Sequence, residues 1–204
     1  MPMEEGLLFV ISGPSGAGKG TVCKRILEEL DIDLSVSMTT RKPREGEVHG
    51  VSYYFVSQDE FRERIEADGF FEYAQVYDNF YGTPKQMVME QLAKGRDVLL
   101  EIDTQGALNV KAAYPDGVAI FLLPPSLPEL RRRLTGRGTE TPEAVERRLS
   151  ETRKEISCMK EYDYCVVNDD LEEAVDRVVS IIKAEHSRVS RGVQDLMKRY
   201  EEEV

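Results

Sequence analysis

A glycine-rich segment near the N-terminus constrains the fold of this chain more than any other feature. Apolar residues 7–11 before it predict a buried strand. After it, Val22, Ile26 and Leu30 recur at every fourth position, which predicts a helix with one apolar face. Strand, glycine-rich turn, lysine and helix together indicate a phosphate-binding loop, in which backbone N–H groups and the helix N-terminus surround an anion. Lys19 is expected to reach the outer phosphates. The segment reads Gly13-Pro14-Ser15-Gly16-Ala17-Gly18-Lys19-Gly20-Thr21.

A turn that only joins a strand to a helix is the competing interpretation, but such a turn needs no lysine. One position departs from the usual loop, which has Ser or Thr directly after the lysine as a Mg²⁺ ligand. Here Gly20 has that position and Thr21 follows it. The direct hydroxyl ligand is therefore missing from its usual place.

The composition is that of a single folded domain with small insertions at most. The chain has 204 residues, of which 41% are hydrophobic and 32% charged, enough apolar content for a core. Its net charge of −11 argues against a nucleic-acid partner, so any anion must be held by local arginine clusters. The first apolar run is too short for a membrane span or a signal peptide, so we expect no membrane partner and a cytoplasmic location.

The cysteines and histidines favour neither disulfides nor a zinc site. Cys23, Cys158 and Cys165 are odd in number and lack metal-ligand spacing. Cys23 and Cys165 fall in apolar segments, so we expect buried free thiols in a reducing compartment. His49 and His186 are isolated in the sequence.

Alternating strands and helices predict the core. Further buried strands are expected at 33–37, 98–103, 117–123 and 164–167, with helices beginning after Ser126 and Thr141 and around Val175. This order predicts a parallel sheet with helices on both faces.

Residues 37 to about 90 are expected to form an aromatic-rich insertion in that core. Residues 38–47 read as an exposed polar loop, and 51–56 and 70–76 read as strands. Ser57 begins a capping box, and Thr83 followed by Pro84 is a second helix-start signal.

Arginines outside the loop suggest what receives the phosphoryl group. Arg41 and Arg44 lie three residues apart in the insertion, with Tyr53 and Tyr81 in the same region. Guanidinium forks and tyrosine hydroxyls bind phosphate, so these four residues predict a second phosphate site. An ordinary solvated arginine pair is the alternative.

A second arginine set, Arg137, Arg147 and Arg148, flanks a glycine-punctuated loop. Such a loop can move as a lid, and its arginines can neutralise a transferring phosphoryl group. A solvated helix face is the competing interpretation. If the acceptor is a phosphate monoester, no general base is needed, and catalysis rests on positioning and charge neutralisation.

Several segments, in order from about residue 7 to 186, resemble the guanylate kinases. Each segment alone is weak, but the combination is specific. The segments are Ser12 to Lys19, Ser35 to Arg44, Gly46-Glu47 with Tyr53 and Phe55, Glu72-Tyr73-Ala74, Tyr81-Gly82-Thr83, Ile102-Asp103-Thr104-Gln105-Gly106, Gly136-Arg137-Gly138-Thr139-Glu140 and Val167-Asn168-Asp169-Asp170.

The resemblance implies a three-layer α/β fold, a parallel β-sheet core with helices on both faces as in phosphate-loop kinases. A mixed α/β GMP-binding insertion and a helical lid complete it. On this basis residues 1–204 form one domain. The core is 5–36, 96–126 and 161–190, the insertion 37–90, the lid 127–160 and the C-terminal tail 188–204.

The resemblance also implies roles for single residues. ATP would be held by Gly13 to Thr21 with Asn168 near the adenine, and Lys19, Arg137 and Arg148 would be catalytic. Arg41, Arg44, Tyr53 and Tyr81 match residues that hold the GMP phosphate. Ser37, Glu72, Thr83 and Asp103 match residues that read the base, with Glu101 beside them or facing water on Mg²⁺.

The base-reading set suits guanine. A carboxylate at Glu72 accepts from guanine N1 and N2, and the hydroxyls of Ser37 and Thr83 donate to O6. Adenine would leave Glu72 facing a lone pair. Thr83 is also a good helix N-cap, and either role, or both, fits the sequence.

The resemblance therefore implies transfer of the γ-phosphoryl group of ATP to GMP, giving ADP and GDP, with Mg²⁺ as cofactor. The Gly-Lys-Gly-Thr form is similar to the adenylate kinase loop, which leaves Thr21 or water as the metal ligand. Two alternatives stay open, an inactive phosphopeptide-binding module and adenylate kinase-type specificity. The sequence leaves open the use of dGMP and the choice between monomer and homo-oligomer.

Overall fold

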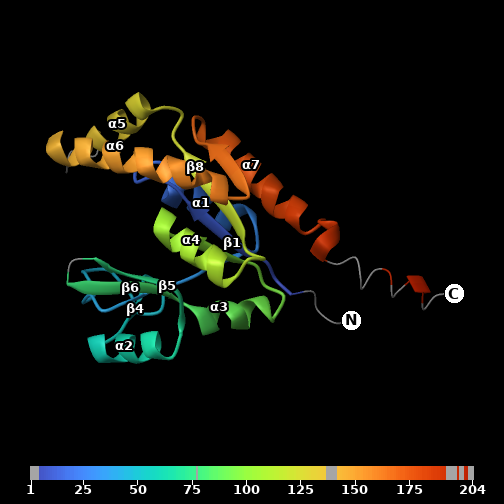
Figure 1. The fold of residues 1–204 in the computed structure, drawn as a ribbon. Helices are drawn as coiled ribbons and strands as arrows, with labels where there is room; N and C mark the ends of the chain where they lie inside the picture. Colours follow the sequence, from blue (N-terminus) through green and yellow to red (C-terminus); the bar gives the residue numbers. More distant parts are fainter. Residues whose placement is uncertain (1–4, 77, 137–141, 192–196, 198–199, 202–204) are drawn as a thin grey trace.

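The computed structural model describes residues 5–76, 78–136, 142–191, 197 and 200–201. Its centre is a five-stranded sheet, with a smaller sheet at one end and a pair of helices at the other (Figure 1). No helix in the described part of the chain is both long and apolar enough to cross a membrane.

The central sheet is parallel throughout, which confirms the predicted α/β class. Its strand order is β2-β7-β1-β8-β9, with Leu8 beside Val98 and Phe9 beside Val118. A parallel neighbour needs a crossover, so the chain moves between the two faces of the sheet as it adds strands. The strands are β1 (Leu8–Ser12), β2 (Asp33–Leu34), β7 (Val98–Glu101), β8 (Val118–Leu123) and β9 (Tyr164–Val167).

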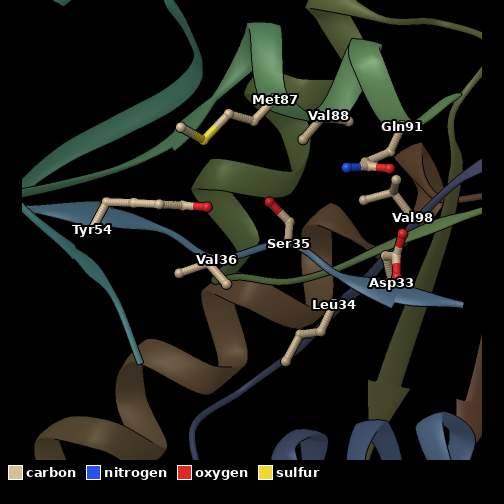
Figure 2. A pocket seen from close by; sticks show the side chains of 9 residues that line it. All are labelled: Asp33, Leu34, Ser35, Val36, Tyr54, Met87, Val88, Gln91 and Val98. Carbon is tan, nitrogen blue, oxygen red and sulfur yellow. The ribbon is translucent and has the colours of Figure 1, made fainter. Parts of the chain in front are cut away.

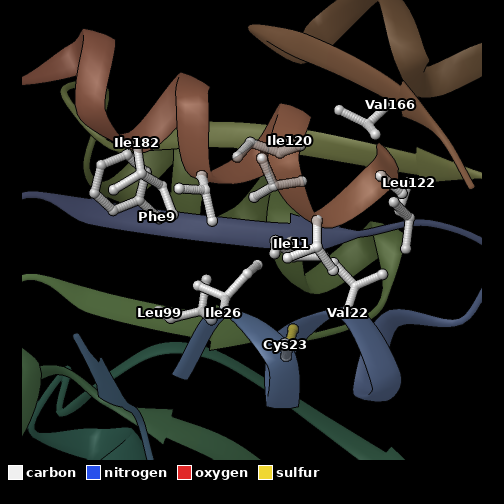
Figure 3. Close-up of a cluster of buried hydrophobic side chains, with 14 of the residues drawn as sticks. Phe9, Ile11, Val22, Cys23, Ile26, Leu99, Ile120, Leu122, Val166 and Ile182 are labelled. Atoms are coloured by element: carbon white, nitrogen blue, oxygen red, sulfur yellow. The ribbon is translucent and has the colours of Figure 1, made fainter. Parts of the chain in front are cut away.

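Helices cover both faces because alternate strand residues point to opposite sides. Phe9 and Ile11 pack with α1 (Lys19–Glu29) and α7 (Leu171–Glu185) on one face (Figure 3). Leu8 and Val10 pack on the other face with α3 (Lys85–Leu92) and α4 (Thr104–Ala113). The two apolar clusters fix the sheet between the helices and hold the carboxyl ends of β1 and β7 in place.

The insertion carries its own mixed sheet, in the order β4-β3-β6-β5. Its helix α2 (Gln58–Glu66) begins at Ser57, whose hydroxyl accepts from the Glu60 N–H as predicted. Phe61 of α2 is fully buried and stacks on Phe70 at 4.4 Å between ring centroids. The strands are β3 (Met38–Thr39), β4 (Tyr54–Phe55), β5 (Phe70–Val76) and β6 (Asn79–Pro84).

The helical pair consists of α5 (Leu127–Thr135) and α6 (Pro142–Ser157), followed by the 3₁₀ helix η1 (Cys158–Glu161). Ser126 caps α5 through the Glu129 N–H, as the sequence predicts. The pair has a small apolar core of its own, built from Leu130, Leu134, Val145 and Leu149.

Several predicted elements were wrong in extent or type. Met38 and Thr39 were expected in an exposed loop but form the buried strand β3, because they pair with Tyr81 and Gly82 of β6. Strand β6 itself was not predicted, and Thr83 belongs to it instead of capping α3. The strands expected at 33–37 and 51–56 are only two residues long, since they join sheets only briefly.

Helix α4 was missed in the sequence, and Cys165 was misplaced. Asp103 caps α4 through the Gly106 N–H at 2.7 Å, whereas the sequence indicates only a strand that ends in carboxylates at this point. Cys23 is buried as expected, whereas Cys165 is exposed. Val166 points into the core, whereas Cys165 and Val167 point to the other face of β9, which is left exposed at this edge of the central sheet.

Candidate active site

The glycine-rich loop follows β1 and leads into α1, with a backbone that only glycine fits. Gly13, Gly16 and Gly18 have φ values of 139°, 92° and 95°, in the left-handed region that strains other residues. A Cβ at Gly13 would lie 2.1 Å from the Leu122 carbonyl oxygen, and a Cβ at Gly18 would lie 2.4 Å from Asn168 Nδ2. The loop is therefore wedged against residues at the ends of β8 and β9.

Lys19 is the first residue of α1 and curls back over the loop. Its Nζ donates to the carbonyl oxygens of Gly13 at 2.6 Å and Pro14 at 3.2 Å. Burial lowers the pKa of Lys19, and the nearby carboxylates of Glu101, Glu155 and Asp103 oppose that shift. The Lys19 amine is therefore partly buried, with three carboxylates close enough to affect its pKa.

Helix α6 reaches the loop from the opposite side. Arg148 Nη1 donates to the Ser15 hydroxyl, which places this predicted catalytic residue on the loop. Glu155 lies two helical turns further on and faces Lys19 and Asp103. Burial raises the pKa of Glu155, and the charge of Lys19 opposes the rise. The sequence analysis missed Glu155, although its spacing from Arg148 puts both on one face of α6.

The unusual Gly20 has a structural counterpart in Glu101. A Cβ built at Gly20 would lie 3.5 Å from Glu101 Oε1. Glu101 is also the first of the carboxylates that act on Lys19, and burial raises its own pKa. The carboxylate at the end of β7 therefore occupies space next to the position where other loops carry a hydroxyl.

A second cationic cluster lies in the insertion. Arg41 makes two hydrogen bonds to Glu47, at 2.8 and 2.9 Å, and its guanidinium lies 5.5 Å from the Tyr53 ring centroid. Tyr53 and Tyr81 meet edge to face at 6.0 Å. The hydrogen bonds from Arg41 lower the pKa of Glu47 to about 2. The structure thus brings three of the four predicted phosphate-binding residues together around a carboxylate.

Glu47 also contacts Arg44, the fourth predicted phosphate-binding residue. Its Oε2 accepts from the Arg44 backbone N–H at 2.7 Å, while the Arg44 side chain is exposed. Glu47 was not among the predicted site residues. Its signal in the sequence was its place in the Gly46-Glu47 segment of the family resemblance, which gave this residue no role.

The predicted base-reading residues converge where the insertion faces the core. Thr83 Oγ1 donates to Glu72 Oε1 at 2.7 Å, and burial raises the pKa of Glu72. A Cβ at Gly106 would lie 3.2 Å from Glu72 and 3.3 Å from Asp103, so both carboxylates border the start of α4. Ser37 directly precedes β3, whose Met38 pairs with Gly82 next to Thr83.

The described residues thus form a glycine-rich loop with a lysine and a separate arginine cluster in the insertion, and Glu72 and Asp103 lie beside each other at the start of α4. The family model described as guanylate kinase matches residues 5–185. The chain belongs to the guanylate kinase family.

Individual relatives cover nearly the whole chain. A guanylate kinase of Clostridioides difficile (strain 630) is 54% identical over 205 residues, covering 100% of both chains. One of Clostridium tetani (strain Massachusetts / E88) is 56% identical over 189 residues, covering 93% of this chain and 91% of the relative. The crystal structure of guanylate kinase from Anaplasma phagocytophilum matches with a TM-score of 0.75 at 38% identity, over 97% of this chain and 96% of that one.

The other predicted site residues of this guanylate kinase family member make fewer contacts with the two groups described above. Asn168 is buried and its amide donates to the Ala17 carbonyl oxygen at 2.8 Å, so its side chain supports the loop. Thr21 is exposed on α1. Arg147 is exposed beside Glu151, one turn along α6. Arg137 lies outside the described residues.

Proposed function

We infer that this chain transfers the γ-phosphoryl group of ATP to GMP, giving ADP and GDP. The observation that carries the inference is that one chain holds two separate cationic groups, Lys19 on the glycine loop and Arg41 in the insertion cluster. We propose that each binds a phosphate, and that Glu72, beside Thr83, accepts from guanine. Membership of the guanylate kinase family supports the same reaction.

Neither alternative has support from the comparisons or from the site. An inactive phosphopeptide module would have no need for the strained glycines and the lysine of the loop. Adenylate kinase-type specificity conflicts with Glu72, because a carboxylate cannot donate to the adenine ring nitrogen N1.

On the donor side, we propose that the loop from Gly13 to Thr21 holds the ATP phosphates. Lys19 would leave its loop carbonyls for the outer phosphates, since an anionic oxygen is the stronger acceptor. Arg148, already on Ser15, would stabilise the transferred group, together with Arg137. Asn168 would act near the adenine and also hold the loop in shape.

On the acceptor side, we propose that the GMP phosphate takes the place that Glu47 now has on Arg41. Arg44, Tyr53 and Tyr81 would add donors to the same phosphate. Glu72 would accept from guanine N1 and N2, with Ser37, Thr83 and Asp103 completing the base site. A phosphate monoester oxygen is already anionic, so no residue has to remove a proton from it.

We propose Mg²⁺ as the cofactor, bound with ATP. Oxygen ligands suit this ion, and Glu101 beside Gly20 offers a carboxylate where a hydroxyl is missing. When bound there, the ion would supply positive charge against the phosphate oxygens during transfer. Thr21 would act through water, because it is exposed on α1. Glu101 is thus better placed for the donor side than for the base.

We also propose the functional subregions given by the sequence. Residues 37–90 would move as the GMP-binding insertion and 127–160 as the lid, on the core of 5–36, 96–126 and 161–190. The contact of Arg148 with Ser15 supports the lid assignment, because it joins α6 directly to the ATP loop.

A coupled assay that offers GMP, dGMP, AMP, CMP, UMP and dTMP with ATP tests the function. We expect GMP to exceed AMP by about a hundredfold or more in kcat/KM, because a lost charge-assisted hydrogen bond costs about 3 kcal/mol. Glu72→Gln should remove most of this preference.

The control variant is Glu66→Gln, an exposed carboxylate at the end of α2. It should leave the preference unchanged. AMP or a pyrimidine as the best acceptor would contradict the base assignment. Phosphopeptide binding without any turnover would contradict the reaction itself.

A further inference from the structure

A cavity of about 200 Å³ lies where the insertion joins the core, between β2, β4 and α3 (Figure 2). Ser35 and Val36 line it from the segment that leads from β2 into the insertion. Met87, Val88 and Gln91 line it from α3, which leads from the insertion back to the core. Both chain connections between the two parts therefore border one cavity.

This hinge cavity shares no lining residue with the nucleotide sites proposed above. The neighbouring residues Tyr53 and Tyr54 separate the two, since Tyr53 meets Arg41 and Tyr81 whereas Tyr54 lines the cavity. Occupation of the cavity is therefore compatible with bound GMP.

Three polar side chains point into the hinge cavity from three different segments. Figure 2 shows the hydroxyl groups of Tyr54 and Ser35 and the amide of Gln91 directed toward a common space. Within the described ranges, none of the three side chains has a hydrogen-bond partner. Together they offer donors and acceptors to a molecule in this space.

Apart from Asp33, the remaining lining side chains are apolar. Val88 and Val98 are each 2% exposed, and the flexible Met87 side chain extends along one wall (Figure 2). Asp33 is the charged lining residue, and Arg96 already binds both of its oxygens at 2.6 and 2.8 Å. A charged ligand would lose its hydration without gaining a partner, so the cavity suits a neutral molecule.

We propose that the hinge cavity is a binding site for a neutral, flat heteroaromatic molecule of one or two rings that carries a donor and an acceptor on one edge. A volume of about 150 Å³ is enough to hold benzene, so the hinge cavity, at about 200 Å³, has room for a slightly larger ring system. The ring faces would pack on Met87 and the two valines. The polar edge would bond Gln91, Tyr54 and Ser35.

Such a ligand would slow turnover without competing with GMP. The kinetic part rests on the proposed function, because there the insertion carries GMP to the ATP loop and must open again to release GDP. A molecule that contacts both connections, at Ser35 and at α3, restricts this motion. The binding part stands on the cavity alone.

The test uses 7-azaindole, which is neutral and has a donor and an acceptor on one edge. Methyl-detected NMR of the full chain, with and without saturating GMP, should show shifts at Met87, Val88 and Val98. Gln91→Leu and Tyr54→Phe should each raise its dissociation constant about three- to tenfold, the effect of one hydrogen bond. At saturation the probe should lower kcat and leave the KM for GMP unchanged.

Two controls match the probe and the variant. Picolinate, a flat anion with as many non-hydrogen atoms, should bind much more weakly than 7-azaindole. Gln86→Leu, on the same helix but bonded to Glu90 at the surface, should leave the dissociation constant unchanged. Thermal melting checks that each variant is folded. If Gln91→Leu does not fold, the affinity of Tyr54→Phe decides the outcome.

The proposal is overturned by any of four results. These are absence of shifts at the methyl groups of Met87, Val88 and Val98, displacement of the probe by GMP, unchanged affinity in the folded variants, or unchanged kcat at saturation. Methyl shifts in a chain that shows no GMP phosphorylation would leave the cavity site standing and reject the proposed function instead.

Discussion

The two proposed phosphate sites are built in opposite ways. The loop at Gly13 to Lys19 is made of backbone, fixed by close contacts to Leu122 and Asn168. The insertion cluster is made of side chains, and Arg41 is held by Glu47, the carboxylate that we propose the GMP phosphate replaces. The first site is shaped by steric contact, and the second by an exchangeable ion pair.

This difference has a physical consequence for binding. A backbone site costs little to organise when the ligand arrives, because folding has already fixed it. A side-chain site with an internal carboxylate keeps its guanidinium oriented but makes the ligand compete for it. Substitutions at the loop should therefore affect folding or catalysis strongly, whereas substitutions at the cluster should affect mainly the affinity for GMP.

The largest expected effect is that of Lys19→Met. It removes the cation of the loop site, and we expect kcat to fall about a thousandfold, as when a charge-stabilising donor is lost. Steady-state kinetics at saturating ATP and GMP measure it. Lys24→Met, exposed on the same helix, is the control and should keep full activity. A fall of less than tenfold for Lys19→Met would rule out its catalytic role.

Glycine substitutions compare the backbones of the two sites directly. Gly13→Ala would meet the Leu122 carbonyl and should lower the free energy of unfolding by about 3 kcal/mol or more. Gly46→Ala, in the insertion loop, has a φ of 84° but open space around the new Cβ, and should cost only about 1 kcal/mol. Urea denaturation measures both. Equal losses would mean that the loop is not sterically fixed.

Arg41→Lys tests the side-chain site. Lysine keeps the charge but loses the bidentate geometry, so the KM for GMP should rise about tenfold while the KM for ATP stays the same. Steady-state kinetics with each nucleotide varied in turn give both constants. Arg62→Lys on the surface of α2 is the matched control. A parallel rise in both constants would place Arg41 outside the GMP site.

The smallest expected effect is a pH dependence through Glu72. Burial raises its pKa, so lowering the pH protonates it earlier than an ordinary carboxylic acid and removes an acceptor for guanine. We expect the KM for GMP to rise about threefold over this titration, with no matching change for ATP. Glu72→Gln should lose this pH dependence. A wild-type profile that is equal for both nucleotides would contradict the assignment.

The same titration affects stability with a defined sign. The folded chain holds the Glu72 proton more tightly than the unfolded chain does. Its contribution to the free energy of unfolding therefore decreases as the pH rises from the ordinary pKa to the raised one, and stays lower above it. Urea denaturation over this pH range measures it: the free energy of unfolding of the wild type minus that of Glu72→Gln isolates this contribution.

Local patterns predicted much of the fold. The strand β9 and the capped starts of α2 and α5 agree with the sequence, because apolar alternation and capping side chains act over a few residues. Strand β6 and helix α4 were missed. Their residues have mixed local signals, and pairing with β3 and β5, or capping by Asp103, decides their structure.

The candidate site shows the same division. The loop and Lys19 could be identified from residues that are adjacent in sequence. Glu47 stood in one of the resembling segments, but nothing in the sequence assigned it a role. Neither its pairing nor that of Glu155 could be predicted, because a carboxylate in a charged segment looks the same whether it is solvated or paired. Cys165 was placed wrongly for a related reason, since an apolar strand does not reveal whether it lies at the edge of a sheet.

The sequence by itself determined the phosphate loop, the α/β class and, through its motifs, the membership of the guanylate kinase family. These depend on residue spacing and local geometry, and a short stretch of sequence is enough to specify each pattern. Only the tertiary structure decided that Glu101 fills the space beside Gly20, that Glu47 holds Arg41, and that both hinge connections border one cavity. Each of these joins segments that meet only after the sheets have formed, so no local pattern could specify them.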